Sequence, residues 1–256
     1  MKKFSIITLT LNSEGTIFDN LKSIELQNYK NLEHICYDGS SVDGTLKILN
    51  KYKNKKRKIF KSNKKGLYKS LNEAIKMSKG EYIGILHSDD IFFKQNVISN
   101  IAKKFKNKKI NVIYTNIKIV KKNNIKKTQR NWVSNKKIFE NKIFNKTEYI
   151  TLLKKGWMPP HTGFFIRKKI FKKIKYNLKY SISADYDFMI KVLKKFNGIY
   201  YLPITSTLMR SGGKSTKISS IFLKLVEDLE IIKKNNIGSY FTLFKKIFSK
   251  INQFYN

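Results

Sequence analysis

Two adjacent aspartates, Asp89 and Asp90, follow a short apolar run at residues 83–86. Neighbouring carboxylates repel each other unless a cation or hydrogen-bond donors compensate them. Hard oxygen ligands suit Mg²⁺ or Mn²⁺, and magnesium is commonly held by one or two carboxylates together with substrate phosphates. The doublet therefore predicts a divalent-cation site that grips a diphosphate, with capping of the following helix as the simpler alternative.

These carboxylates need elements that hold them. The first 120 or so residues alternate apolar, β-branched runs with segments of helical periodicity, which is typical of an α/β fold with a parallel sheet wrapped by helices. Polar residues such as Asn12, Asp38 and Ser88 follow the expected strands, and ligands of such sheets bind outside the carboxyl ends of the strands, so we expect one shared cleft. The expected strands span residues 4–11, 32–37, 58–61, 82–86 and 111–120, and the expected helices span 16–26, 44–52, 67–78 and 94–105.

The second half of the chain gives fewer signals. A lysine- and asparagine-rich stretch at 121–147 is expected to be a mobile connector, followed by a strand at 164–167, a helix at 185–196 and a strand at 199–202. After Gly213 a basic tail carries one apolar helical stripe, formed by Tyr240, Phe241, Phe244, Ile247, Phe248, Ile251 and Phe254. The stripe could pack on the protein's own body or lie in a membrane interface with lysines at the headgroups.

The formal net charge is +37, from 54 lysines and arginines against 17 aspartates and glutamates. Arginine binds phosphates and base edges more specifically than lysine, because its planar guanidinium can donate two parallel hydrogen bonds. Yet arginine occurs only at positions 57, 130, 167 and 210, and lysines are spread through nearly every segment. We therefore expect a solvated lysine coat that favours anionic membrane surfaces, and no specific nucleic-acid partner.

Other classes of protein are constrained by what the sequence lacks. Cys36 is the only cysteine, so no intrachain disulfide can form, and no apolar run nears the roughly 18 residues that span a bilayer. We expect a cytoplasmic protein, with peripheral contact to the inner face of the cytoplasmic membrane. A basic nucleic-acid-binding protein and a sugar nucleotidyltransferase stay as alternatives, although residues 12–15 do not supply the glycine- and arginine-rich phosphate loop of the latter.

Four segments in a fixed order carry a resemblance. They are Phe4–Glu14, Asp38–Thr45, Lys65–Tyr68 with Leu71-Asn72, and Gly80–Asp90. Together they resemble the family 2 glycosyltransferases of the GT-A fold, a group that includes enzymes of bacterial polysaccharide and lipopolysaccharide assembly. The resemblance is close over about residues 1–115 and looser over about 157–215. It implies a nucleotide-sugar-binding half at 1–115, an acceptor-binding half at 116–215 and a basic amphipathic helical tail at 216–256.

The resemblance also implies roles for the donor side. The nucleotide base of the donor is expected to bind Asp38, because a buried carboxylate can accept a hydrogen bond from a ring N–H such as that of uracil. A uridine donor is therefore the first expectation. Asp90, with Asp89, is expected to hold Mn²⁺ or Mg²⁺. Lys69 departs from the family pattern, which usually carries an acidic residue there. The donor contacts are expected from Thr8, Asn12, Glu14, Asp38, Lys65, Gly66, Asn72, Ser88 and Asp89.

On the acceptor side the resemblance makes Asp185 the catalytic base of an inverting transfer to a glycan or lipid-linked hydroxyl, with Asp187 as the alternative base. A single carboxylate suffices, because the nucleotide leaves with its charge neutralised and needs no acid. Asp185 could also simply favour the positive start of its helix. The acceptor or the diphosphate is expected to contact Trp157, His161, Arg210 and Lys214, although Trp157 could be core and His161 an ordinary hydrogen-bonded residue.

Overall fold

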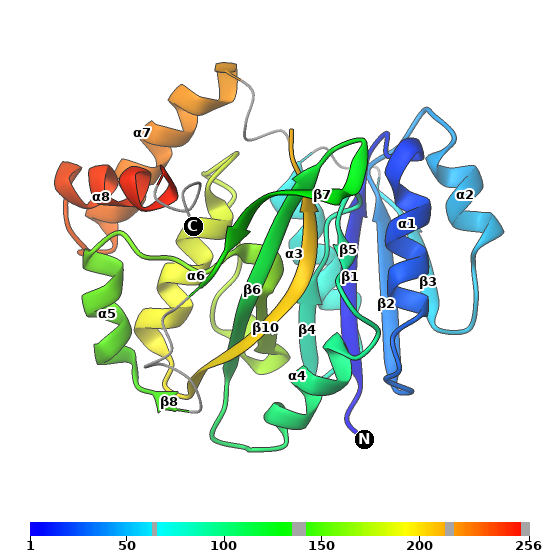
Figure 1. Ribbon diagram of the computed structural model, residues 1–256, viewed down its shortest axis with the longest axis horizontal. Helices are drawn as coiled ribbons and strands as arrows, with labels where there is room; N and C mark the ends of the chain where they lie inside the picture. The colour runs from blue at the N-terminus through cyan, green and yellow to red at the C-terminus, as the bar shows by residue number, and fades with distance from the viewer. Residues whose placement is uncertain (63–65, 135–141, 213–217, 252–256) are drawn as a thin grey trace.

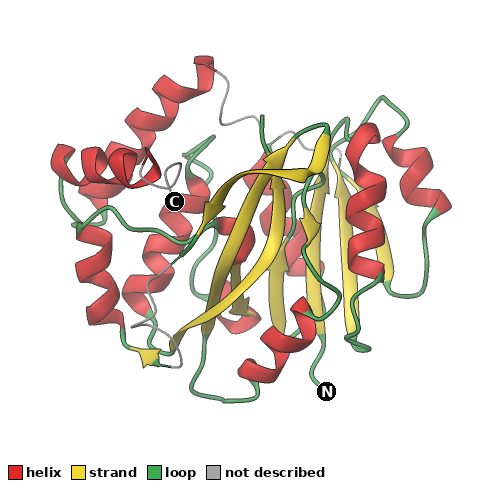
Figure 2. Cartoon of the chain, in the orientation of Figure 1, coloured by secondary structure: helices red, strands yellow, loops and turns green. Residues whose placement is uncertain are grey.

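A computed structural model describes residues 1–62, 66–134, 142–212 and 218–251, which form a mixed sheet with helices on both faces (Figure 1). Within these residues the sheet has ten strands, in the order β3-β2-β1-β4-β9-β6-β10-β5, with β7 beside β6 and β8 beside β10. Figure 2 shows the strands gathered in one central layer, with helices before and behind it. The expected α/β class is confirmed.

The first four strands in this order are parallel. They are β3 (Arg57–Lys61), β2 (Leu32–Asp38), β1 (Phe4–Thr10) and β4 (Tyr82–Ile85). Strands β1, β2 and β4 are buried on both faces. β4 is accordingly an apolar run, whereas β1 and β2 also bury polar side chains, which are hydrogen-bonded. Thr10 pairs with Asp38 and Ile7 pairs with Ile85, so the carboxyl ends of these strands open at one edge of the sheet.

Helices cover both faces of this parallel part. Helices α1 (Glu14–Glu25) and α2 (Thr45–Lys51) pack against Cys36, whereas α3 (Leu67–Met77) packs in the cluster that contains Ile35. Consecutive side chains of a strand point to opposite faces, so α1 and α2 lie across the sheet from α3. Helix α4 (Val97–Phe105) packs through the cluster that contains the ring of Phe4.

The other half of the sheet mixes directions. Strand β9 (Phe164–Arg167) runs antiparallel between β4 and β6 (Val112–Lys121), and β10 (Ile199–Arg210) runs parallel to β6. Two short strands, β5 (Ile91–Phe92) and β8 (Ile143–Phe144), pair antiparallel with β10. Strand β5 follows the acidic doublet directly, so its pairing ties the loop at residues 86–90 to β10.

The expected mobile connector at 121–147 is wrong for the part that the structure describes. β7 (Asn124–Trp132) pairs antiparallel with β6, β8 pairs with β10, and α5 (Lys146–Lys154) begins inside this stretch. Most of β7 is exposed at the edge of the sheet, where lysine and asparagine are tolerated and an apolar face is not needed. Its strand pairing therefore leaves little trace in composition. Residues 135–141 lie outside the described residues.

Strand β10 is also much longer than the expected strand at 199–202. It continues through Pro203 to Arg210, and its register with β6 shifts between Tyr201 and Thr205. Proline lacks the amide that the ladder requires, so an irregularity at this point is the expected cost of continuing. The extension carries Arg210 to the edge of the sheet where the acidic doublet lies.

The remaining helices gather at one end of the molecule, away from α1 and α2 (Figure 1). Helix α5 contacts α6, α6 contacts α7, and α7 contacts α8. Two short 3₁₀ turns, η2 and η3, flank β9. The bounds are η2 (His161–Gly163), η3 (Lys168–Lys172), α6 (Ala184–Lys195), α7 (Ile218–Lys234) and α8 (Tyr240–Ile251).

The described part of the tail consists of two helices, and α8 packs on the body through side chains that lie outside the aromatic stripe. Thr242 and Lys246 are buried against the body, where Thr242 Oγ1 donates to the carbonyl of Lys154 at 3.2 Å and Lys246 pairs with Asp228 at 2.7 Å. The aromatic stripe faces outward: Phe241 and Phe244 remain 64% and 55% exposed. Among the described helices, none is both long and apolar enough to cross a bilayer.

Candidate active site

The acidic doublet lies on the loop that follows β4. Asp90 is buried, and its Oδ1 accepts the backbone N–H of Arg210 at 3.3 Å. Its Oδ2 is buried without a hydrogen-bond partner in the described part of the chain. Burial, and then the neighbouring Asp89 carboxylate, raise the pKa of Asp90 well above its ordinary value. One carboxylate oxygen is therefore desolvated, unsatisfied and next to a second carboxylate.

Two polar side chains hold this loop in place. Asn20, on α1, donates from Nδ2 to the carbonyls of His87 at 2.8 Å and Asp90 at 2.9 Å. Arg210 donates to the carbonyl of Asp89 at 2.7 Å and pairs with Asp19 at 2.5 Å. Part of the arginine charge expected to meet a diphosphate is thus already offset by Asp19.

The doublet fits a divalent cation on the chemistry of its donors. A magnesium or manganese ion needs one or two carboxylates when phosphates and waters supply its other ligands. Asp90 offers its unpartnered Oδ2, and Asp89 is half-buried beside it. No cluster of three or more histidine, cysteine or acidic side chains able to hold a metal occurs among the described residues. The remaining ligands would therefore have to come from substrate and water.

The loops after β1 and β2 are fastened to each other at the same edge of the sheet. Asn12, in the left-handed region at φ 49°, accepts the Val42 amide at 3.0 Å. Glu14 Oε2 accepts the amide of Gly44 at 3.0 Å, and the Glu14 amide donates to Asp43 at 3.1 Å. A Cβ at Gly44 would lie 2.1 Å from the Glu14 carboxylate, so a larger residue there would displace this side chain from its contact with the Gly44 amide.

Asp38 is buried at the end of β2 and is held by its own neighbourhood. Its carboxylate accepts from the hydroxyl of Thr10 at 2.8 Å and from the amide and hydroxyl of Ser41 at 2.9 and 2.6 Å. Ser13 and Ser88 share a hydrogen bond of 2.8 Å between their hydroxyls, which joins the first loop to the doublet loop. Asp38, Asn12 and the doublet thus stand on interconnected loops.

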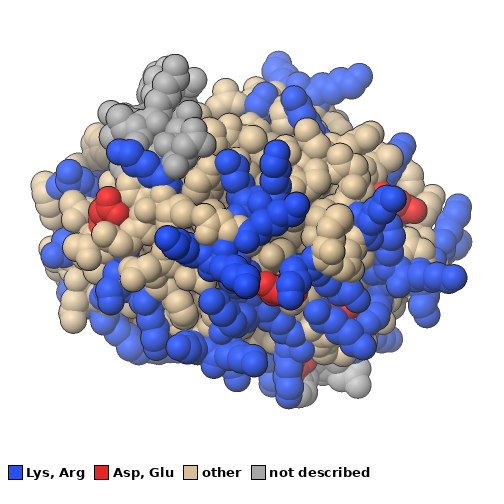
Figure 3. Space-filling model, turned by 90° about the horizontal axis from the view of Figure 1, so that it is seen from below, with Lys and Arg blue, Asp and Glu red and all other residues tan. Residues whose placement is uncertain are grey.

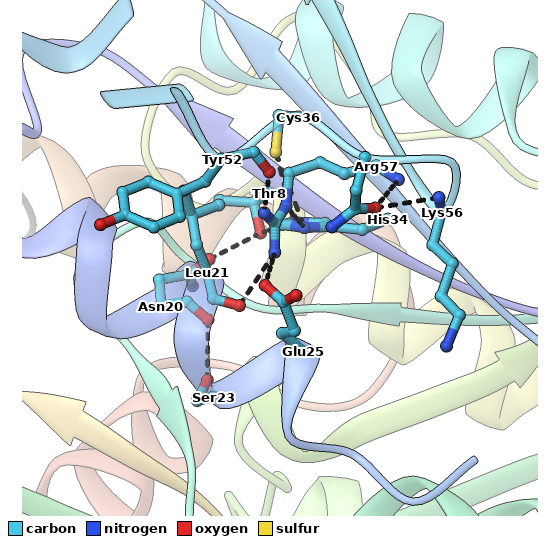
Figure 4. A network of polar contacts seen from close by, with 11 residues as sticks. Thr8, Asn20, Leu21, Ser23, Glu25, His34, Cys36, Tyr52, Lys56 and Arg57 are labelled. Atoms are coloured by element: carbon cyan, nitrogen blue, oxygen red, sulfur yellow. Dashed lines mark hydrogen bonds and ion pairs between the residues drawn. The ribbon is translucent and has the colours of Figure 1, made fainter. Parts of the chain in front are cut away.

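Thr8 lies deeper, between the sheet and α1 (Figure 4). Its hydroxyl is 3.0 Å from His34 Nε2 and donates to Asn20 Oδ1 at 3.4 Å. The buried Arg57 donates from Nε to His34 Nδ1 at 3.1 Å, which leaves the histidine proton on Nε2, directed at Thr8. Burial, and then Arg57, lower the pKa of His34 well below its ordinary value. Thr8 thus belongs to a buried polar network between β1, β2 and α1, beneath the loops that follow the strands.

Other residues expected on the donor side have different surroundings. Gly66 precedes α3 with φ 124°, a conformation that favours glycine. Asn72 accepts the Tyr176 amide at 3.0 Å and donates to its carbonyl at 2.9 Å, so its side chain pins the segment that leads into α6. Lys65 and Lys214 lie outside the described residues.

Asp185 stands at the start of α6, beside side chains that come from distant parts of the chain. Its Oδ1 accepts the Tyr186 amide at 2.8 Å, and the Tyr68 hydroxyl lies 3.2 Å from the same atom and 2.5 Å from the carbonyl of Ile182. Tyr68 stacks on Tyr176, with ring centroids 5.7 Å apart. The carboxylate is therefore fixed on one side only.

His161 links the surroundings of Asp185 to the doublet loop. Its Nε2 is 2.9 Å from the Tyr176 hydroxyl, and its ring lies 5.7 Å from that of His87, two residues before Asp89. Desolvation lowers the pKa of His161 to about 4, against the opposing effect of Asp185. The ring is neutral near pH 7 and acts as a polar contact between the two acidic sites.

The alternative base, Asp187, has a structural place. It is fully buried, pairs with Lys191 at 2.5 Å and accepts from Asn235 Nδ2 at 3.2 Å.

Trp157 packs between Tyr114 and Tyr149, each at a centroid distance of 5.4 Å, and donates from Nε1 to the carbonyl of Ser134 at 2.6 Å.

Glu227, on α7, was missed by the sequence analysis. Its buried carboxylate accepts from the Ser181 amide at 2.8 Å and hydroxyl at 3.0 Å, the Ile182 amide at 3.0 Å and the Ser183 amide at 2.7 Å. These residues immediately precede Asp185 in the chain. No local sequence signal could reveal this role, because the contact joins residues more than forty positions apart.

The chain is similar to known glycosyltransferases. The sequence profile described as "Glycosyl transferase family 2" matches residues 5–175. The Escherichia coli enzyme UDP-Glc:alpha-D-GlcNAc-diphosphoundecaprenol beta-1,3-glucosyltransferase WfaP is 38% identical over 122 residues, which cover 47% of this chain and 48% of the enzyme. The chain thus matches only about half the length of this relative.

Two solved structures share the fold. Staphylococcus aureus TarS 1–349 in complex with UDP-GlcNAc has a TM-score of 0.70 at 21% identity, over 91% of this chain and 65% of that one. The mannosyltransferase PcManGT of Pyrobaculum calidifontis, in complex with GDP-Man and Mn²⁺, has a TM-score of 0.65 at 13% identity, over 91% and 64%. The fold is that of GT-A glycosyltransferases, and with the profile matched over most of its length, the chain belongs to glycosyl transferase family 2.

Proposed function

We propose that this chain transfers a sugar from a nucleoside-diphosphate sugar, with a uridine nucleotide as the first expectation, to a hydroxyl of a glycan or lipid-linked acceptor. The observation that carries the proposal is the link between two acidic sites far apart in sequence. The Asp89–Asp90 loop and Asp185 are connected through four side chains, His87, His161, Tyr176 and Tyr68. The similar structures that contain UDP-GlcNAc or GDP-Man support a nucleotide-sugar donor.

We infer that residues 1–115 bind the donor and 116–215 bind the acceptor. Asp38 and Asn12 would receive the base and ribose, at the edge where the strands end. Asp89 and Asp90 would hold Mn²⁺ or Mg²⁺, which when bound supplies positive charge for the departing diphosphate. The Mn²⁺ in the PcManGT structure supports this choice of cation.

Asp185 would be the base of an inverting transfer. Its Oδ1 is engaged by the Tyr186 amide and by Tyr68, whereas its Oδ2 has no partner in the described part of the chain. The free oxygen would take the proton of the acceptor hydroxyl as that oxygen bonds to the anomeric carbon. The bond from this carbon to the diphosphate breaks at the same time, and the nucleoside diphosphate leaves with the electron pair.

We further propose that a lipid-linked acceptor is met at a membrane surface. The name of the WfaP relative includes a diphosphoundecaprenol acceptor. Helix α8 exposes Tyr240, Phe241 and Phe244 at 67%, 64% and 55%, next to cations such as Lys245. Aromatic side chains beside lysines suit the boundary between lipid headgroups and acyl chains.

The test is a panel of nucleotide sugars, scored for Mn²⁺-dependent release of nucleotide and transfer to acceptor. Asp90→Asn should reduce transfer by about 10²-fold or more, because the site loses a charged metal ligand. Glu25→Gln is the matched control, since Glu25 is an exposed carboxylate on α1 outside the proposed cleft. Near-normal turnover of Asp90→Asn, in the presence of metal, would refute the proposed function.

A further inference from the structure

A hollow of about 590 Å³ lies on the side of α6, and none of its lining residues belongs to the candidate active site. Four segments that are distant in sequence contribute to it: the start of α5, residues 173–175, the last turns of α6 and Asn235, which follows α7. Its other two lining residues are an isoleucine and an asparagine. The six lysines that line it are Lys146, Lys173, Lys175, Lys191, Lys194 and Lys195.

The positive charge of this lysine hollow is largely uncompensated. Lys191 pairs with the buried Asp187, and Lys194 donates to the carbonyl of Asn235. These two contacts hold both ammonium groups in position from beneath. Among the described residues, the ammonium groups of the other four lysines have no ion-pair or hydrogen-bond partner, although the backbone amide of Lys146 donates to Asn197. Like charges around one concave space repel each other, and a multivalent anion in that space would relieve the repulsion.

The lysine hollow differs from the general lysine coat in its shape. Figure 3 shows lysines and arginines spread over one whole face of the molecule, with few acidic residues among them. On a convex surface each ammonium group is solvated separately and binds anions weakly. Here groups from three segments line the same space, whose volume is in the range of small-molecule sites.

We propose that the lysine hollow is a binding site for two or more phosphate groups, carried by one soluble ligand or by adjacent lipid headgroups. The compact ammonium group of lysine binds phosphate as a point charge and needs no fixed fork geometry, which suits closely spaced phosphates. A soluble phosphate chain and the phosphate headgroups of lipids share this chemistry. The site borders the acceptor side, because Lys175 directly precedes Tyr176, the contact of His161.

Calorimetric titration with inorganic tripolyphosphate, in EDTA and about 0.15 M salt, tests the proposal. The triple variant Lys146→Gln/Lys173→Gln/Lys195→Gln removes one exposed charge from each wall. Its affinity should fall by about tenfold or more, because several phosphate ion pairs are lost. The matched control, Lys53→Gln/Lys55→Gln/Lys108→Gln, removes the same charge from exposed lysines elsewhere and should bind like the parent protein.

A second arm distinguishes the sources of phosphate. Vesicles of phosphatidylglycerol are compared with vesicles of phosphatidylcholine, using the same proteins. Loss of binding confined to the hollow variant supports the site, with triphosphate pointing to a soluble ligand and vesicles alone pointing to lipid headgroups. Equal loss in both triple variants, or no binding of either probe, overturns it. Asp90→Asn should bind both probes normally, so this result is independent of the proposed transfer.

Discussion

At the scale of single residues, the proposed base depends on what its two carboxylate oxygens contact. The Oδ1 of Asp185 is held by an amide of its own helix and lies near the Tyr68 hydroxyl. That hydroxyl has one proton and two acceptors, and the carbonyl of Ile182 is the nearer one. Tyr68 therefore positions the start of α6 as much as it contacts the carboxylate, which leaves Oδ2 for a substrate proton.

Asp185→Asn tests this assignment with a side chain of the same shape. An amide cannot take the proton of the acceptor hydroxyl, so kcat should fall by about 10²- to 10⁴-fold. Donor affinity, measured calorimetrically with UDP and Mn²⁺, should stay unchanged because the donor contacts lie on other loops. Weaker donor binding with retained turnover would contradict the role of base.

Buried His34 gives a prediction about stability and pH. Its folded pKa is well below 6.5, so the unfolded chain takes up a proton that the folded chain refuses once the pH falls below about 6.5. The contribution of His34 to stability is therefore fully present above this pH and declines below it, by up to about 1.4 kcal/mol at one unit lower. The free energy of unfolding, measured with urea between about pH 7.5 and 5.5, should fall with decreasing pH. In His34→Gln the slope against pH should be smaller, by the amount that corresponds to uptake of about one proton on unfolding. The same slope in both proteins would be the contrary result.

At the scale of elements, α7 supports the start of α6, where the proposed base Asp185 lies. Glu227 gathers the amides of Ser181, Ile182 and Ser183 just before α6 begins. Without Glu227 these amides would need water as their acceptor. Their orientation also determines where α6 begins, and so where Asp185 lies in its first turn. The tail thus contributes to the geometry of the proposed base.

Glu227→Ala should therefore lower kcat/KM for the acceptor while leaving UDP binding unchanged. It should also lower the free energy of unfolding by about 1–3 kcal/mol, because buried amides lose their acceptor. Glu230→Ala, three residues along the same helix and paired with exposed Lys179, is the matched control and should have little effect. Partial recovery of activity in Glu227→Gln, which keeps one acceptor oxygen, separates positioning from general destabilisation. Equal effects in the two alanine variants would contradict the role.

The sequence allowed most of the parallel elements to be predicted, because buried strands such as β1 and β4 are rich in apolar and β-branched residues. It failed where tertiary context decides the structure. β7 is an exposed edge whose lysines resemble a linker, and β10 continues past Pro203 because β6 offers a pairing partner on the far side of the irregularity. Partners of this kind are not visible in a local pattern.

The candidate site divides in the same way. The strand-end loops around Asn12, Asp38 and Asp90 could be placed, because parallel strands must end together. The contacts that complete the site could not: Tyr68 meets Asp185 across 117 positions, and Arg210 meets Asp90 across 120. Thr8 was expected at the donor and has buried partners, since alternation along β1 directs it to the face covered by α1.

At the scale of the whole molecule, 54 basic residues stand against 17 acidic ones, which gives a net charge of +37. Long-range attraction to any anionic surface follows, and it weakens as salt screens the charges. Such attraction alone would bring the protein to an anionic membrane without fixing its orientation. An orienting element must be local, and α8 offers exposed aromatic side chains at the end of the molecule where α5, α6 and α7 also gather (Figure 1).

Removing that apolar surface should separate orientation from attraction. Phe241→Ser/Phe244→Ser should weaken binding to phosphatidylglycerol vesicles by about tenfold or more, because two partly exposed rings can no longer enter the interface. The net charge is unchanged, so the remaining binding should be more sensitive to salt than that of the parent. Val133→Ser/Leu178→Ser is the control, since both side chains are 57% exposed outside α8. Equal weakening in both pairs would mean that scattered apolar surface is responsible. Unaltered binding in the α8 pair would assign membrane contact to the lysines alone.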